Sequence, residues 1–154
     1  MKKKLNLFCV LMLLLLATDV VMTFVTGADD FAKGWEEGRN AGPAVTWPLF
    51  LAFIMELVAV AAAIAAFACF LRFILNVNQN KVFVWDNVPL LRITGVGLLL
   101  LALVAAGDGL FSGSSFVEVY DNYFDILVFS VFNLIVAEVF SIGLKLKEEQ
   151  DLTI

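Results

Sequence analysis

Residues 47–75 read WPLFLAFIMELVAVAAAIAAFACFLRFIL, and this stretch decides the class of fold. Its only charged residues are Glu56 and Arg72. The stretch exceeds the roughly 20 apolar residues with which an α-helix crosses about 30 Å of hydrocarbon. Residues 47–75 are therefore predicted to form a membrane-spanning helix.

Three further apolar blocks lie on either side of this stretch, at residues 5–26, 90–111 and 125–144. Of the 154 residues, 62% are hydrophobic and 16% are charged, whereas apolar residues make up roughly half of a soluble domain. The tails and connecting loops are too short to build a separate soluble core, for which about 50 residues is a usual minimum. The sequence predicts an all-α integral membrane four-helix bundle that forms a single domain over residues 1–154.

The distribution of basic residues predicts the orientation of this bundle. Lys2, Lys3 and Lys4 precede the first block, and basic residues that flank a span favour the cytoplasmic side. Four spans then return the C-terminus to the same side. Of the 10 lysine and arginine residues, only Lys33 and Arg39 would lie outside. Both termini are therefore predicted to be cytoplasmic.

The first block also has the features of a secretory signal peptide. Three lysines precede an apolar run, and Thr26-Gly27-Ala28 offers small residues at a candidate cleavage site. The run continues past Asp19 to Val25, which is longer than the usual signal-peptide core of roughly 7–15 residues. This length favours a retained helix, and cleavage stays open as the alternative.

The composition argues against several classes of function. The chain contains no histidine, the residue most used for acid–base catalysis and zinc binding. Cys9 and Cys69 alone make a poor metal site, and no nucleophile paired with a base is evident. The net charge of −5 argues against direct nucleic-acid binding. The sequence thus predicts a non-enzymatic protein with no metal and no cofactor.

Each span contains one acidic residue within its apolar run, since Asp125 only begins the fourth block, and three of these acids form a candidate intramembrane polar cluster. Asp19, Glu56 and Asp108 lie in the outer halves of their spans, which contain no lysine or arginine. Ionisable groups inside a membrane are costly and normally face the bundle interior or water. The three carboxyl groups either bind a cation or proton in a small transporter, channel or sensor, or they are interfacial and packing residues. Transport through so small a bundle would require a homo-oligomer.

The fourth acid, Glu138, lies near the inner end of its span. Arg72 and Arg92 occur at similar depth and can extend their long side chains towards it. This arrangement predicts a structural ion pair.

Small residues are concentrated on the second and third spans. Ala59, Ala63 and Ala66 share a helical face, and Gly95 and Gly97 begin a small surface on the third span. Small residues let membrane helices approach closely, so this pattern predicts close packing.

Two segments at the predicted inner face carry a family resemblance. Residues 80–95 read NKVFVWDNVPLLRITG, and residues 144–154 read LKLKEEQDLTI. They resemble the domain of unknown function 2975 family of small bacterial four-helix membrane proteins. In that family a Phe, an Asn and a Leu-Arg pair precede the third helix, and an acidic segment followed by Leu-Thr-Ile ends the chain. Gln150 stands where the family commonly has Asn, a mild departure.

The resemblance implies location in the bacterial cytoplasmic membrane. It also implies a soluble partner, because members of the family are often encoded beside a small helix-turn-helix regulator. The residues that would dock this regulator are Phe83, Asn87, Leu91, Arg92, Glu148, Glu149, Asp151, Leu152 and Ile154. Acidic groups near the C-terminus would complement a basic DNA-binding protein. The alternative is that the tail is a frayed, solvated helix end. The expected partners are therefore the lipid bilayer and this regulator, with a homo-oligomer left open.

Overall fold

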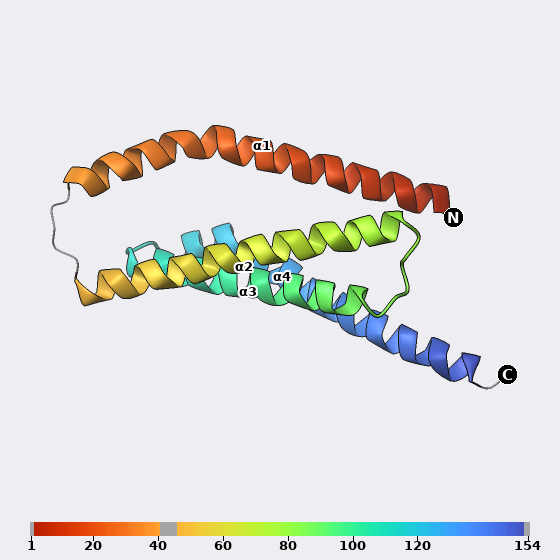
Figure 1. Ribbon diagram of the computed structural model, residues 1–154. Helices are drawn as coiled ribbons and strands as arrows, with labels where there is room; N and C mark the ends of the chain where they lie inside the picture. Colours follow the sequence, from red (N-terminus) through yellow and green to blue (C-terminus); the bar gives the residue numbers. More distant parts are fainter. Residues whose placement is uncertain (1, 41–45, 153–154) are drawn as a thin grey trace. The chain divides into compact units, whose positions relative to one another are not determined.

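The computed structural model describes residues 2–40 and 46–152, which form four helices (Figure 1). These are α1 (Lys2–Asn40), α2 (Trp47–Asn78), α3 (Asn87–Phe111) and α4 (Phe116–Asp151). Each contains a segment long and apolar enough to cross a membrane. The predicted all-α class is confirmed, and the four apolar helices indicate a multi-pass membrane protein.

The helices extend beyond the apolar blocks from which they were predicted. The loop expected after residue 26 is helical as far as Asn40, and α4 begins at Phe116 rather than near residue 125. The α2–α3 and α3–α4 connections are therefore shorter than the gaps between the apolar blocks. An apolar block marks the part of a helix that tolerates hydrocarbon, whereas the helix itself continues for as long as its backbone hydrogen bonds do.

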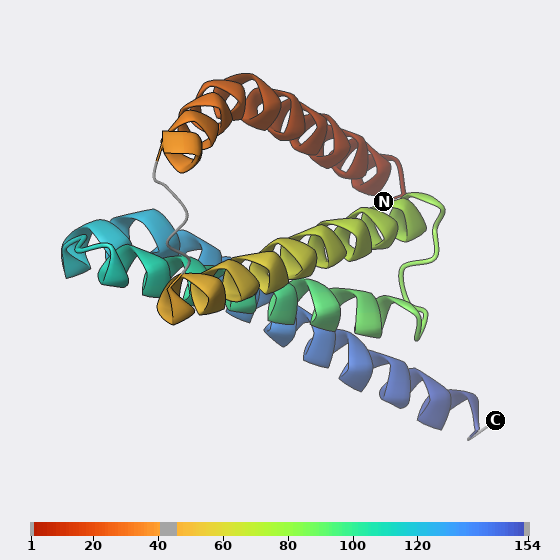
Figure 2. The same ribbon diagram turned by 60° about the vertical axis from the view of Figure 1, so that its left-hand side comes forward.

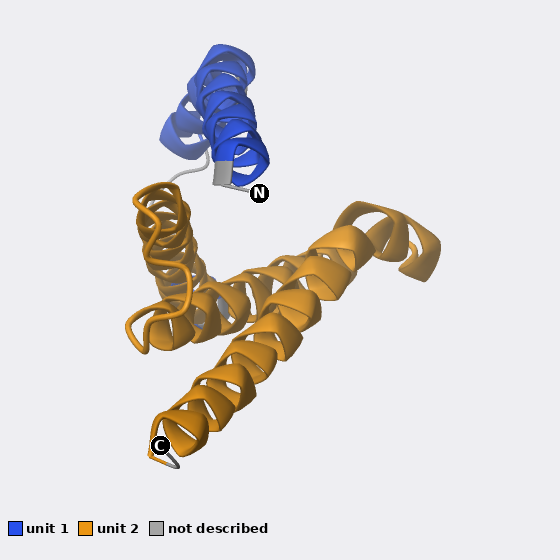
Figure 3. Cartoon of the chain, turned by 90° about the vertical axis from the view of Figure 1, so that its right-hand side faces the viewer, with its two compact units in different colours: residues 1–50 blue, residues 51–154 orange. Residues whose placement is uncertain are grey.

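The chain divides into two compact units, residues 1–50 and residues 51–154 (Figure 3). Unit 1 contains α1 and the first turn of α2. Within it, α1 passes through Thr26-Gly27-Ala28 without a break. Unit 2 contains the remainder of α2 together with α3 and α4. Organisation as a single domain stays a prediction.

A short turn joins α3 to α4 in unit 2. Gly113 adopts a φ of +88°, and the amides of Gly113 and Ser114 donate to the carbonyls of Leu110 and Gly109, respectively. This pattern is a Schellman motif, which needs a left-handed residue after the helix. Ser115 and Glu118 then form a reciprocal capping box at the start of α4. These local signals turn the chain within a few residues.

The carboxyl end of α2 closes in the same manner, with asparagine in place of glycine. Asn80 has a φ of +64°, a conformation that asparagine tolerates better than most residues. The amide of Asn80 donates to the carbonyl of Val77, and that of Lys81 donates to the carbonyl of Asn76. The chain then leaves the helix axis and begins the α2–α3 loop.

Within unit 2, α3 runs back along α2 and packs against α4 (Figures 1 and 2). A Cβ atom on Gly97 would lie 2.8 Å from the carbonyl oxygen of Ala62 on α2. A Cβ atom on Gly95 would lie 2.9 Å from the carbonyl oxygen of Ser130 on α4. The two glycines therefore allow α3 to contact helices on two of its faces, as their small size predicted.

The core of unit 2 continues towards the α2–α3 loop. Each of its three helices contributes buried apolar side chains there, namely Ile74, Val77, Val88, Leu91 and Leu144. This end of the unit therefore provides a packed base for the loop and for the nearby part of α4.

Candidate functional site

The α2–α3 loop is held by the side chain of one buried residue, Asn87. Its Nδ2 atom donates to the carbonyl oxygens of Lys81 and Val82, each at 2.7 Å. Its Oδ1 atom accepts from Nδ2 of Asn76 on α2 at 2.9 Å. Asn87 is 0% exposed, and buried amide groups are stable only when they are paired. The loop conformation therefore depends on Asn87.

The same loop is tied to the end of α4. The indole Nε1 of Trp85 donates to Oε1 of Glu148 at 2.6 Å, across 63 positions of sequence. A hydrogen bond to an ionised carboxylate is shorter and stronger than one between neutral groups. The loop segment and the tail segment identified in the sequence thus meet in one region, which we call the loop–tail surface and define by Phe83, Trp85, Glu148 and Leu152.

Aromatic rings continue from this region into the helices. Phe83 stacks on Phe140 of α4 with ring centroids 5.5 Å apart, and Phe140 meets Phe73 of α2 edge to face at 6.0 Å. Phe73 and Phe70 are neighbours on α2, and Phe70 contacts Phe129 of α4. Packing of these rings joins α2, α4 and the loop.

The structure separates the predicted docking residues into exposed and buried groups. Phe83 and Leu152 are 60% and 87% exposed. The acidic side chains of Glu148, Glu149 and Asp151 are also exposed. Asn87 and Leu91 are instead 0% and 1% exposed. They therefore support the loop–tail surface from the core and offer no area to a docking partner. Ile154 lies outside the described residues.

Arg92 makes an ion pair with Glu138 of α4. Its Nη2 and Nε atoms lie 2.8 Å and 3.0 Å from the same oxygen, Oε1. Both side chains are about half exposed, so the pair lies at the surface of the α3–α4 contact. Arg72 makes no ion pair within residues 2–40 and 46–152, and it lines a groove on α2 and α3.

The acids of the candidate intramembrane cluster lie in different parts of the molecule. Asp19 belongs to unit 1 and is exposed on α1, whereas Glu56 and Asp108 are exposed on unit 2. The packing of Gly97 against Ala62 sets an antiparallel register between α2 and α3. That register places Asp108 roughly one and a half turns beyond the level of Glu56. The two carboxyl groups of unit 2 are therefore not at one depth.

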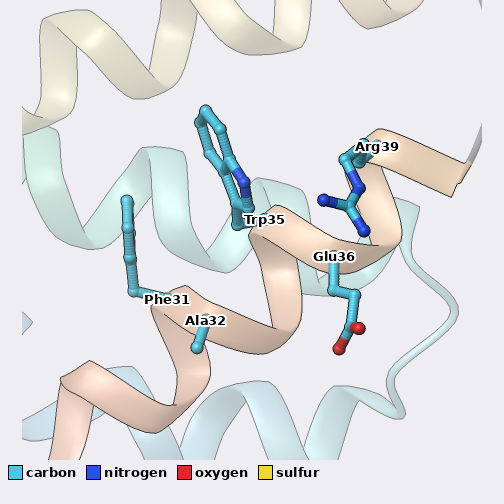
Figure 4. Close-up of a pocket in the computed structure, with 5 residues that line it drawn as sticks. All are labelled: Phe31, Ala32, Trp35, Glu36 and Arg39. Atoms are coloured by element: carbon cyan, nitrogen blue, oxygen red, sulfur yellow. The ribbon is translucent and has the colours of Figure 1, made fainter.

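A shallow pocket on α1 is lined by residues of that helix alone, Phe31, Ala32, Trp35, Glu36 and Arg39 (Figure 4). The rings of Phe31 and Trp35 stack with centroids 6.4 Å apart. Among the described residues, no group of three or more His, Cys, Asp or Glu side chains could hold a metal ion. The described residues that line this pocket all belong to α1, so the pocket does not bring two helices together.

Sequence reasoning did not identify two amides, the half-buried Asn76 and the buried Asn133. Asn76 pairs with Asn87, and Asn133 of α4 donates to the carbonyl of Phe129 at 2.8 Å. An amide within an apolar helix was the signal available for Asn133. The partner of Asn76 could not be found in this way, because the pairing depends on the path of the loop.

The four apolar helices indicate a multi-pass membrane protein, and side-chain hydrogen bonds of Asn87 and Trp85 hold the segment between α2 and α3. A family model described as "Protein of unknown function (DUF2975)" matches residues 32–154, so the chain belongs to that family. The match confirms the family resemblance of residues 80–95 and 144–154. No curated protein and no solved structure matches the chain.

Proposed function

We propose that this protein is a non-enzymatic membrane protein that binds a small helix-turn-helix regulator at the loop–tail surface. The observation that carries the proposal is the Trp85–Glu148 hydrogen bond, which joins both family segments in one region. In this proposal the protein lies in the bacterial cytoplasmic membrane with both termini cytoplasmic. The lipid bilayer and the regulator are its partners, and it binds no nucleic acid directly.

The chemistry of the loop–tail surface supports this proposal. Phe83 and Leu152 expose apolar area, while Glu148 and Asp151 add negative charge beside it. Aromatic anchors inside a charged rim are typical of protein–protein contacts. Acidic groups also attract a basic DNA-binding protein and favour its association.

Co-purification from the native host in mild detergent tests the proposal. We expect the full chain to retain a helix-turn-helix protein identified by mass spectrometry, and we expect deletion of residues 146–154 to lose it. Phe83→Ala should weaken retention at least tenfold, because burying an aromatic anchor contributes more than about 1.4 kcal/mol.

Phe116→Ala is the control, because Phe116 is also an exposed phenylalanine and lies at the start of α4, away from the tail. Retention should be unchanged in this variant. Equal retention of the regulator by the full chain, the deletion and Phe83→Ala would remove the loop–tail surface from the mechanism.

A small ion- or proton-coupled transporter is the second candidate function, and Glu56 favours it. This carboxyl group is exposed on unit 2 in the middle of an otherwise apolar segment of α2. Inside a membrane such a group needs a partner or water, which a homo-oligomer would supply. The expected outcome is that Glu56→Gln abolishes proton or cation flux into proteoliposomes. Flux equal to that of empty vesicles in both wild type and variant would eliminate this function.

A further inference from the structure

A groove of about 670 Å³ lies between the last turns of α2, the α2–α3 loop and the first turns of α3. Its polar lining residues are Arg72, Asn76, Lys81 and Asp86, and its apolar ones include Leu90 and Ile93. All of them belong to unit 2. The volume falls within the range of small-molecule sites, roughly 300–1,000 Å³. The groove is distinct from the loop–tail surface and shares no residue with it.

The basic groups of the groove are available to a ligand. Neither Arg72 nor Lys81 makes a side-chain ion pair or hydrogen bond within the part of the chain that the structure describes. Arg92, by contrast, is already engaged by Glu138. The acidic lining residue, Asp86, makes no capping bond to α3 and opposes two positive charges. The groove therefore has a surplus of positive charge.

The loop holds the backbone of Lys81 in place before any ligand binds. The amide of Lys81 donates to the carbonyl of Asn76, and the carbonyl of Lys81 accepts from Asn87. Because both backbone groups are fixed, binding a ligand orders only the side chain of Lys81.

The positions of Arg72 and Lys81 along the chain suit contact with a lipid headgroup. Arg72 lies roughly 9 Å before the end of α2, and Lys81 lies beyond that end. Both cations thus fall near the end of a membrane-spanning helix, where a long basic side chain reaches headgroup level. Leu90 and Ile93 extend the groove along α3, and Ile93 is 46% exposed. The lining therefore combines phosphate-binding groups with apolar surface.

We propose that this groove binds the phosphate-bearing headgroup of an anionic phospholipid. Arg72 and Lys81 contact the phosphate, and Leu90 and Ile93 contact the first carbons of an acyl chain. Basic pockets between membrane helices are a recognised means of binding anionic headgroups. The apolar part of the lining favours a lipid over free phosphate. The proposal does not depend on the proposed function or on the orientation of the chain.

Native mass spectrometry of the delipidated full chain tests this site. The protein is titrated with phosphatidylglycerol and with phosphatidylcholine of the same acyl chains. Two basic groups should favour phosphatidylglycerol by about thirtyfold at one site. Arg72→Gln with Lys81→Gln should remove that preference. Lys145→Gln with Lys147→Gln changes the net charge equally outside the groove and should leave the preference intact.

Asp86→Asn gives the opposite expectation, because removing the opposing carboxylate should tighten phosphatidylglycerol binding by about fivefold. This gain keeps the test decisive if the double variant folds poorly. Unchanged preference in the groove variant, or equal loss in the control pair, would overturn the proposal. Displacement of phosphatidylglycerol by millimolar inorganic phosphate would overturn the assignment to a lipid, since a free anion would then suffice.

Discussion

At the scale of single residues, Asn87 combines three side-chain hydrogen bonds with complete burial. Replacing it with alanine would leave the Asn76 amide and the carbonyls of Lys81 and Val82 without their partner. A polar group left unpaired away from water costs roughly 1–3 kcal/mol, and these three groups are partly buried. We expect Asn87→Ala to destabilise the protein by about 2–4 kcal/mol and to lower its thermal midpoint in detergent.

Asn122→Ala is the control for this prediction, because Asn122 is an exposed amide on α4. The thermal midpoint of Asn122→Ala should differ from that of the wild type by no more than a stability change of about 0.5 kcal/mol would cause. Equal midpoints for Asn87→Ala and Asn122→Ala would show that the Asn87 contacts do not hold the loop.

Trp85 offers a second prediction at this scale. Trp85→Phe keeps an aromatic ring but removes the N–H group that donates to Glu148. An exposed bond to a carboxylate contributes roughly 1 kcal/mol, which corresponds to about a fivefold change in a local opening equilibrium. Amide hydrogen exchange over residues 146–152 should accelerate by about that factor, whereas Trp47→Phe, on the first turn of α2, should leave it unchanged. Unaltered exchange in Trp85→Phe would show that the bond does not restrain the tail.

At the scale of helices, the spacing between α2 and α3 depends on Gly97. A Cβ atom there would lie 2.8 Å from both the Ala62 carbonyl oxygen and the Ala66 Cβ atom, neither of which can move without shifting α2. Overpacking of this kind costs roughly 1–3 kcal/mol. Gly97→Ala should therefore lower the thermal midpoint of the protein in detergent.

Gly107→Ala is the matched control on the same helix, because a Cβ atom there would meet nothing within 4 Å. It should stabilise α3 by roughly 0.5–1 kcal/mol, since alanine favours a helix over glycine. A stabilising effect of both substitutions would mean that α2 and α3 do not approach closely at Gly97.

Helix existence could be predicted from the sequence, but the ends of helices and the pairing of side chains could not. Apolar length alone identified all four spans. The early start of α4 followed from the Ser115–Glu118 capping box, a local signal that lies outside the apolar block. The sequence predicted that Arg72 and Arg92 lie at similar depth to Glu138, and the rotation of each helix decides which arginine reaches it.

The candidate site shows the same limit. Family likeness grouped Asn87 and Leu91 with Phe83, although the first two are buried and the third is exposed. Residue type cannot separate a side chain that forms a surface from one that supports it. The bond between Trp85 and Glu148 joins positions 63 apart, and no local pattern in either segment indicates this pairing.

At the scale of the whole molecule, the orientation of the chain decides where both proposed binding regions act. The bias of basic residues predicts that the α2–α3 loop lies inside and the α3–α4 turn outside. Cysteine labelling in spheroplasts tests this, with Cys9 and Cys69 replaced by alanine to remove the native thiols. Ser114→Cys and Gln79→Cys form a matched pair, because both positions are exposed and each lies just beyond the end of a helix.

A membrane-impermeant maleimide should label Ser114→Cys in intact spheroplasts, and it should label Gln79→Cys only after the membrane is permeabilised. The reverse pattern would place the loop–tail surface outside the cell, where no transcription regulator could reach it. The proposed lipid groove would survive that result, because it requires only that Arg72 and Lys81 lie at headgroup level on one side of the bilayer. The labelling pattern can therefore contradict the regulator proposal without contradicting the lipid proposal.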